Sequence, residues 1–178
     1  MIAVDLLRNK RCHISDEVLS PEALFRSDLV ALLPDLRAFS RSLCHERATA
    51  DDLAQKTVVI ALSKRHQFTP GTNLKAWLFT IMRSQFYSER RSAGRRNATM
   101  EQSDIEGVVG VDIADRSSGL IDLSKALWRL NPLFREALML VGAAGFSYEE
   151  AAKLCDCTLG TMKSRVSRAR RVLFEALS

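Results

Sequence analysis

The chain has 178 residues, 47% of them hydrophobic, which is enough for one domain or two small ones. Its net charge of +5 favours a polyanionic partner such as nucleic acid, although an anionic membrane surface also attracts a basic protein. No apolar run is long enough to span a bilayer, so we expect a cytoplasmic protein. The four cysteines and three histidines lack the spacing of a zinc site, which predicts reduced thiols and no metal or other cofactor.

The first half of the chain is predicted to be helical. After a loose tail over residues 1–20, Ser20 and Pro21 have the form of a helix cap and first turn. Apolar residues then recur at helical spacing as far as position 43, and Pro34 should kink or split this helix. A break is expected over residues 45–49, and the next helix should open at residues 49–52, where acids meet the helix dipole.

The helix predicted for residues 74–91 has two faces of different character. One face is most simply core and carries Leu74, Trp77, Leu78 and Ile81. The other interleaves aromatic and basic residues: Lys75, Phe79, Arg83, Phe86 and Arg90. Such a face can bind single-stranded nucleic acid, because rings stack on bases and arginines hold the backbone. Packing of the two phenylalanines against a neighbouring helix explains the pattern equally well. The helix is expected to end in a basic cluster around Gly94.

Between residues 97 and 119 the composition changes, because glycine, serine and acidic residues dominate and the helical periodicity fades. This segment is typical of a flexible interdomain linker. Helices resume at residue 121 and again at Asn131-Pro132, the latter helix stopping at Gly142 or Gly145. We therefore expect an all-α protein with two small helical domains, over residues 21–96 and 120–178.

A helix-turn-helix unit is predicted at the carboxyl end. Ser147 and Glu150 have the spacing of a capping box, and the helix that they open should end near Cys155. A short turn follows, after which Thr158 can cap the last helix. In such a unit the second helix enters the DNA major groove.

The last helix is amphipathic. Its apolar stripe is formed by Leu159, Met162, Val166, Ala169, Leu173 and Ala176. The opposite side, which we call the basic face, carries Lys163, Ser164, Ser167, Arg168 and Arg171, with Arg165 and Arg170 at its edges. Lysine and arginine can read guanine, serine can read several base edges, and flanking arginines can reach phosphates. The alternative is an ordinary solvated basic face.

Three motifs carry a family resemblance. They are Ala50-Asp-Asp-Leu-Ala-Gln-Lys-Thr57, the segment 68–81 continuing to Phe86-Tyr-Ser-Glu-Arg-Arg91, and Ser147-Tyr-Glu-Glu-Ala-Ala152 with Gly160-Thr-Met-Lys-Ser-Arg-Val-Ser-Arg-Ala-Arg170. In this order they resemble regions two and four of an extracytoplasmic-function (ECF) RNA polymerase sigma factor, most like the general-stress subgroup of alphaproteobacteria. The resemblance covers nearly all of the chain after Pro21.

The resemblance implies roles for particular residues. Docking on the clamp helices of core RNA polymerase would fall to Asp51, Asp52, Gln55 and Lys56. The melted −10 region would be bound by Lys75, Arg83, Phe86, Tyr87, Arg90 and Arg91. The −35 element would be bound by Thr161, Lys163, Ser164, Arg165, Ser167 and Arg168, with Arg165 on phosphate. Two positions depart from the family pattern: Ser84 stands in place of the usual asparagine, and Thr158 in place of a common proline.

The resemblance also implies a function and partners. The chain would be a dissociable initiation subunit that recognises promoter DNA, with a linker threading toward the polymerase active-site channel. An anti-sigma protein would hold both domains away from polymerase, and a response regulator with a sigma-like domain would release them by partner switching. Two alternatives are a sigma mimic that sequesters an anti-sigma protein without binding DNA, and a stand-alone helix-turn-helix repressor. An enzyme is not expected, because the sequence contains no phosphate loop, nucleophile arrangement or ligand-spaced metal cluster.

Overall fold

The computed structural model describes residues 20–97 and 118–177, and within these ranges the chain is helical with no β-strand. The first part contains α1 (Pro21–Ala31), α2 (Leu33–Leu43), α3 (Arg47–Ser63), the 3₁₀ turn η1 (Arg65–Gln67) and α4 (Leu74–Asn97). The second part contains α5 (Ser118–Arg129), α6 (Pro132–Leu138), the π-helical turn η2 (Met139–Ala143), α7 (Tyr148–Leu154) and α8 (Leu159–Leu177). The all-α class is therefore confirmed. The expected tail and most of the expected linker lie outside the described residues.

The predicted start and break of the first helical segment are confirmed. The Ser20 hydroxyl accepts a hydrogen bond from the Ala23 amide at 3.2 Å, which caps α1. The segment divides at Leu32, and Pro34 lies in the first turn of α2. A proline is tolerated there, because the first amides of a helix have no intrahelical acceptor to lose.

Two expected helix boundaries are wrong. The helix α3 begins at Arg47, inside the expected break, because nothing between His45 and Thr49 prevents helical backbone once Cys44 has turned the chain. The acids that suggested a later start lie one turn inside the helix. The helix α4 continues past residue 91 to Asn97, since a single interior glycine, Gly94, weakens a helix by only about 1 kcal/mol relative to alanine and does not end it.

Boundaries in the second half follow local signals more closely. The Asn131 side chain accepts from the Leu133 amide at 3.0 Å and caps α6, as predicted. The helical backbone then passes through η2 and stops before Gly145, which has φ +74°. Glycine adopts this left-handed conformation without steric cost. The helix α5 begins at Ser118, a few residues earlier than expected.

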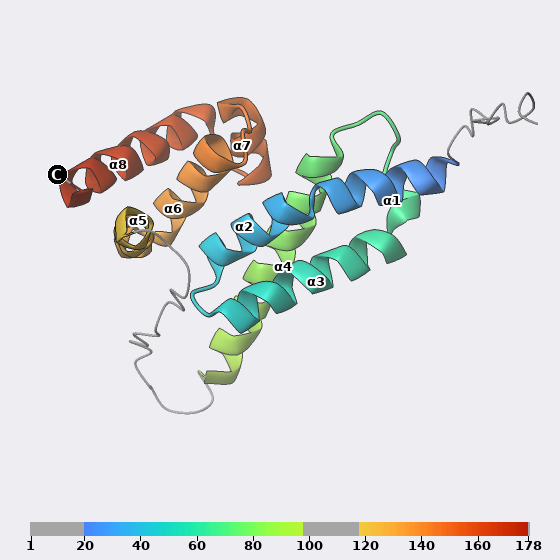
Figure 1. The fold of residues 1–178 in the computed structure, drawn as a ribbon, viewed down its shortest axis with the longest axis horizontal. Coiled ribbons are helices and arrows are strands. Elements are labelled where there is room, and N and C mark those ends of the chain that lie inside the picture. The colour runs from blue at the N-terminus through green and yellow to red at the C-terminus, as the bar shows by residue number, and fades with distance from the viewer. Residues whose placement is uncertain (1–19, 98–117, 178) are drawn as a thin grey trace, which may run out of the picture.

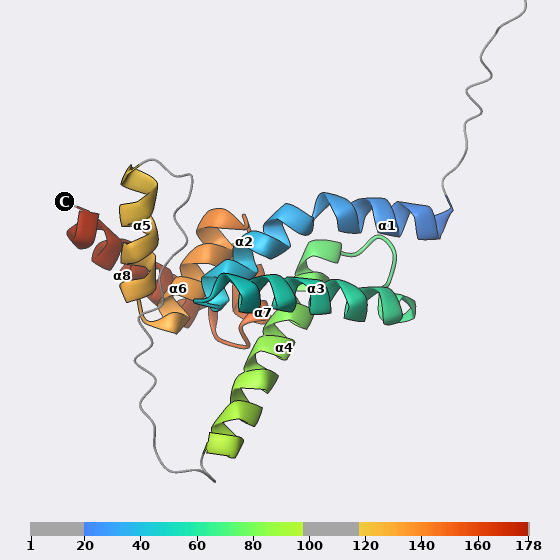
Figure 2. The ribbon, with the colours of Figure 1, turned by 60° about the horizontal axis from the view of Figure 1, so that its bottom comes forward.

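The helices form one continuous apolar core rather than two separate ones. The helices α2 and α3 lie side by side, α4 crosses them, and α6 to α8 pack at the end where α2 meets α4 (Figures 1 and 2). Phe79 of α4 stacks on Phe39 of α2 with ring centroids 4.7 Å apart, and Phe146 meets it edge-on at 5.1 Å. Phe146 immediately precedes the helix-turn-helix. The face of α4 that interleaves aromatic and basic residues is thus the face on which the second half of the chain packs.

Candidate nucleic-acid and polymerase interfaces

The helix-turn-helix begins at a complete capping box. The Ser147 hydroxyl accepts from the Glu150 amide at 3.1 Å, and the Glu150 carboxylate accepts from the Ser147 amide at 2.9 Å. These two bonds satisfy donors that the end of a helix otherwise leaves without acceptors. The hydrogen bond from the Ser147 backbone amide is the main cause that lowers the pKa of Glu150 below its ordinary value. The predicted start of α7 is confirmed.

The turn between the two helices is tight. Asp156 occupies it with φ +51°, the left-handed region that aspartate tolerates better than most residues. The Thr158 hydroxyl then accepts from the Thr161 amide at 3.2 Å and caps α8, as predicted. The hydroxyls of Thr158 and Thr161 also share a hydrogen bond of 2.9 Å. Thr161, expected at the DNA surface, is therefore half-buried and part of the cap in this arrangement.

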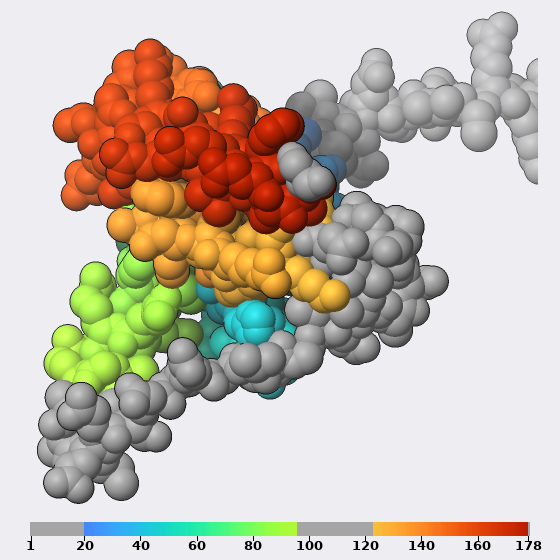
Figure 3. Space-filling model, turned by 90° about the vertical axis from the view of Figure 1, so that its left-hand side faces the viewer, coloured from blue at the N-terminus to red at the C-terminus, as the bar shows by residue number. Residues whose placement is uncertain are grey.

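The buried side of α8 fixes the orientation of its basic face. Met162, Val166 and Ala169 are fully buried, and Ala151 and Ala152 of α7 are buried against the same core. Lys163, Ser164, Ser167, Arg168 and Arg171 are exposed, Arg170 is exposed at one edge, and Arg165 is half-buried at the other. Figure 3 shows the outer side of α8 at the molecular surface, above α5. The structure thus brings together four of the six residues predicted to bind −35 DNA on one open face.

The residues predicted to bind −10 DNA are placed differently. Of these, Arg90 and Arg91 are exposed, whereas Lys75, Arg83 and Tyr87 are half-buried and Phe86 is buried. The Arg90 guanidinium lies 5.4 Å from the Phe86 ring centroid. Of the two interpretations left open for the aromatic residues of this helix, packing describes Phe79 and Phe86 in this arrangement. Neither ring can stack on a base without a rearrangement.

Three of the residues predicted to bind −10 DNA contact other helices of the chain: two contact α6 and one contacts α2. The Arg83 side chain donates from Nε to a carboxylate oxygen of Glu136 at 2.9 Å, and the Tyr87 hydroxyl donates to the other oxygen at 2.8 Å. Burial is the largest single influence and would lower the pKa of Arg83. The charge of Glu136, its hydrogen bond to Arg83 and contributions from Cys155 and Tyr87 together outweigh burial, so the net pKa of Arg83 is raised. Burial and the same carboxylate raise the pKa of Tyr87 to about 12. Lys75 pairs with Asp35 of α2.

The residues predicted to dock on polymerase are spread around α3. Asp52 and Gln55 are exposed, whereas Asp51 is half-buried between two arginines, with ion-pair distances of 3.9 Å to Arg41 and 3.8 Å to Arg47. Lys56 lies on the α4 side of α3 and pairs with Glu89 of α4 at 2.9 Å, a contact that raises its pKa. The charge of both Asp51 and Lys56 is thus already matched within the chain.

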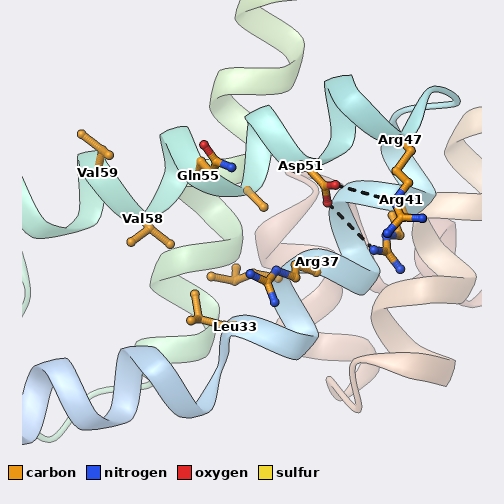
Figure 4. Close-up of a pocket in the computed structure, with 10 residues that line it drawn as sticks. Leu33, Arg37, Arg41, Arg47, Asp51, Gln55, Val58 and Val59 are labelled. Atoms are coloured by element: carbon orange, nitrogen blue, oxygen red, sulfur yellow. Dashed lines mark ion pairs between the residues drawn. The ribbon is translucent and has the colours of Figure 1, made fainter.

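A groove of about 580 Å³ lies between α2 and α3. Figure 4 shows Leu33 and Val58 facing one another across it, with Gln55 and Asp51 further along α3. Residues that the sequence did not single out for docking line it as well: Arg37, Arg41, Arg47 and Val59. The Val59 side chain is 64% exposed. The sequence signal for it was the run of three β-branched residues at positions 58–60, because three consecutive residues of a helix cannot all lie on one buried stripe.

The described residues also bear on metal binding, membrane spanning and thiol chemistry. Within residues 20–97 and 118–177, histidine, cysteine and acidic side chains form no group of three that could hold a metal ion. No helix in these ranges combines the length and apolarity needed to cross a membrane. Cys44 and Cys155 are buried free thiols, and Cys157 is a half-buried one. Burial raises the pKa of Cys155 to about 12 and that of Cys44 to about 11, so neither thiol ionises readily.

Comparisons with known proteins give matches in both halves of the chain. Residues 29–96 match the Sigma-70 region 2 family, and residues 120–173 match the Sigma-70, region 4 family. The ECF RNA polymerase sigma factor EcfG of Rhodopseudomonas palustris is 44% identical over 153 residues, which cover 83% of this chain and 82% of that protein. The ECF sigma factor SigC of Mycobacterium tuberculosis is 32% identical over 126 residues, covering 70% and 68%.

A solved structure is similar over both halves of the chain. It is the sigma factor RpoE of Bartonella quintana in complex with the anti-sigma factor NepR, with a TM-score of 0.77 and 48% sequence identity. The similarity covers 86% of this chain and 96% of that one.

Proposed function

Because this chain belongs to the extracytoplasmic-function type of RNA polymerase sigma factors, we propose that it directs core RNA polymerase to promoters and has no catalytic site of its own. Residues 21–96 form the unit for polymerase docking and −10 binding, and residues 120–178 form the unit for −35 binding, joined by residues 97–119. The observation that carries the proposal is the open basic face of α8, held outward by its buried stripe.

The −35 element is bound through α8. Lys163, Ser164, Ser167 and Arg168 are exposed side by side and reach base edges in the major groove, while Arg165 at the edge holds a phosphate. Thr161 acts with Thr158 at the amino end of the helix, where backbone amides also favour a phosphate. If Arg168 forms a bidentate contact with guanine, Arg168→Ala costs about 1–3 kcal/mol of discrimination at that base pair.

Core polymerase docks on the outer side of α3 through Asp52 and Gln55. Both residues are exposed, and Gln55 lines the α2–α3 groove together with Val58 and Val59, which supports this assignment. Asp51 acts by holding Arg41 and Arg47 at one end of the groove, and Lys56 by tying α3 to α4 through Glu89.

The melted −10 strand is bound along α4 by Lys75, Arg83, Tyr87, Arg90 and Arg91, with Phe86 beneath them. Bases of single-stranded DNA stack on aromatic rings while arginines hold the backbone. Ser84 is exposed on the same helix, and its hydroxyl can hydrogen-bond a base edge as the usual asparagine would, with a shorter reach.

The regulation that we propose is control by an anti-sigma protein. The similar RpoE structure is a complex with an anti-sigma factor, and we propose that this chain is likewise held inactive by an anti-sigma protein in the cytoplasm. The resemblance of the segments 68–81 and 86–91 to the general-stress subgroup supports a role in the general stress response.

Run-off transcription tests the proposal. Core polymerase is assayed with and without the full chain on a template with a stress-type promoter. We expect transcripts that depend on the chain and are lost when Lys163 and Arg168 are both changed to alanine. A matched control changes Lys64 and Lys153, two exposed lysines outside α8, and should transcribe like the unchanged chain.

The outcomes separate the candidate functions. Equal loss in the α8 variant and its control would show that only net charge matters and would refute base reading by α8. A chain that gives no transcript and does not bind core polymerase is not a sigma factor in function. The sigma mimic is then the favoured function, and binding to an anti-sigma protein is the next measurement.

A further inference from the structure

Part of the α4 surface that is proposed to bind −10 DNA, around Arg83 and Tyr87, is covered by the second half of the chain, whereas Arg90 and Arg91 further along the helix are exposed. We call this contact the seam. At its centre the Glu136 side chain of α6 is 1% exposed, and its two carboxylate oxygens accept from Arg83 at 2.9 Å and from the Tyr87 hydroxyl at 2.8 Å. Both oxygens of this buried acid are therefore held by residues that we assign to DNA binding.

The seam extends along α4 in both directions from this carboxylate. The Arg83 guanidinium also donates to the Cys155 carbonyl at 3.3 Å. Nearer the start of α4, the Lys75 ammonium lies 5.7 Å from the Phe146 ring centroid, and the Asn73 side chain donates to Glu150 at 3.1 Å. The contacts thus extend from Asn73 to Tyr87, about four helical turns, and they involve α6, α7, Phe146 before α7 and Cys155 after it.

The chemistry of the central contact is that of a nucleic-acid contact. A carboxylate offers an arginine the same planar pair of anionic oxygens that a phosphate offers. A tyrosine hydroxyl likewise donates to either acceptor. Glu136 therefore occupies the positions on Arg83 and Tyr87 that a DNA phosphate or base acceptor needs.

We propose that the −35 unit is an internal competitor of promoter DNA for α4, with Glu136 in the place of the nucleic acid. In the closed arrangement the basic face of α8 is open while Arg83 and Tyr87 of the −10 surface are covered, so the free chain can offer only one of its two DNA surfaces complete. Binding of the −10 strand requires the seam to open. This inference rests on the proposed function, because it assigns Arg83 and Tyr87 to DNA.

The seam closes without any second protein, through residues of this chain alone. A partner that holds the chain inactive then needs only to bind the closed arrangement better than the open one. Core polymerase acts in the opposite sense when it binds the two units apart. The free energy that opens the seam is the difference between the binding free energy of polymerase for the open chain and its binding free energy for the closed chain.

The test measures binding of the free, full-length chain to a labelled single-stranded oligonucleotide that carries the −10 element of the promoter active in run-off transcription. Glu136→Gln keeps the size of the side chain and removes its charge. The control is Glu149→Gln, the same change at an exposed position of α7. Where the open form is a minor species, the apparent affinity of the unchanged chain for the oligonucleotide is reduced in proportion to the fraction of open chains. Because Glu136→Gln raises that fraction, it should bind the strand about tenfold more tightly or better. Glu149→Gln should bind like the unchanged chain.

Two further measurements separate opening from misfolding. Glu136 lies outside the assigned DNA and docking residues, so the Glu136→Gln holoenzyme should still give run-off transcripts at saturating core polymerase. Small-angle X-ray scattering from the unchanged chain should fit the closed arrangement of Figures 1 and 2. Because this last measurement needs no variant, it decides even where the variant fails to fold.

Three results have distinct meanings. Scattering that fits two separated units overturns the inference, and so does equal affinity of the unchanged chain and the Glu136→Gln variant when both transcribe. Failure of the unchanged chain to transcribe with core polymerase refutes the proposed function instead. Tighter binding by Glu136→Gln alone, with transcription retained, supports an internal competitor.

Discussion

The capping box of α7 allows a quantitative prediction about the helix-turn-helix. We change Ser147 to alanine, which removes the acceptor 3.1 Å from the Glu150 amide and keeps the backbone amide that donates to the Glu150 carboxylate. One of the two bonds of the box is lost and the other remains. The helix α7 has only seven residues, so its first turn is a large part of the contact that positions α8.

The expected cost is about 1 kcal/mol of unfolding free energy, within the usual range of about 0.5–2 kcal/mol for removal of an N-cap side chain. The site is exposed, and water can therefore solvate the amide that loses its acceptor. This places the cost below that of a buried amide left without a partner, which reaches about 3 kcal/mol.

Urea denaturation of the full chain measures this cost as a shift of the midpoint with an unchanged slope. The control is Ser27→Ala, an exposed serine inside α1, where alanine is the better helix former and no loss is expected. If Ser147→Ala is no more destabilising than Ser27→Ala, the box does not hold α7 and the reasoning fails.

The charge of Glu150 adds a pH dependence to the same prediction. Its pKa in the folded chain is lowered by the Ser147 amide first and the Ser147 hydroxyl second. A carboxyl with a lowered folded pKa stabilises the fold above its unfolded pKa and loses this contribution as pH falls through the folded value. The stability difference between the unchanged chain and Glu150→Gln should therefore narrow as pH falls below the ordinary range of a glutamate. A difference that is constant through this range would contradict the assignment.

Two further predictions concern the turn of the helix-turn-helix. At Asp156, which has φ +51°, valine should be less stable than glycine by about 1–2 kcal/mol in urea denaturation, because a β-branched residue is strained in the left-handed region; equal stability of the two variants would show that the turn relaxes. In a Cys12→Ser background at pH 8, a disulfide reagent should modify Cys157 first, since burial raises the pKa of the Cys155 thiol to about 12; simultaneous modification of both thiols would show that the turn opens freely.

The parts of the fold that the sequence predicted are those encoded within a few residues. The caps at Ser20, Asn131 and Ser147 and the break at Pro34 each depend on one side chain and an amide two or three positions away, or on one missing amide. The exposed basic face of α8 followed from its periodicity alone, because the apolar stripe on the other side could only face a core. The errors at the ends of α3 and α4 arose where no residue forces a boundary.

The seam could not be predicted, because nothing local marks it. Arg83 and Glu136 are separated by 53 positions, and the chain between them includes a segment without helical periodicity. Apolar residues of α6 stand at positions 134, 137 and 138, a pattern that gives Glu136 no role. A buried acid between apolar neighbours is recognisable only once its partner on another helix is known.

The central ion pair of the seam also explains why a closed arrangement can still be opened. A buried ion pair gains little net free energy, since the loss of hydration of both charges offsets their attraction, but removing one partner alone is costly. Opening the seam returns Glu136 to water at the moment when Arg83 is released, so neither charge is left buried without a partner. DNA then supplies Arg83 with anionic oxygens equivalent to those that it has lost. The net change is therefore an exchange of one set of acceptors for another, and the remaining cost is the exposure of apolar contacts such as that between Phe79 and Phe146.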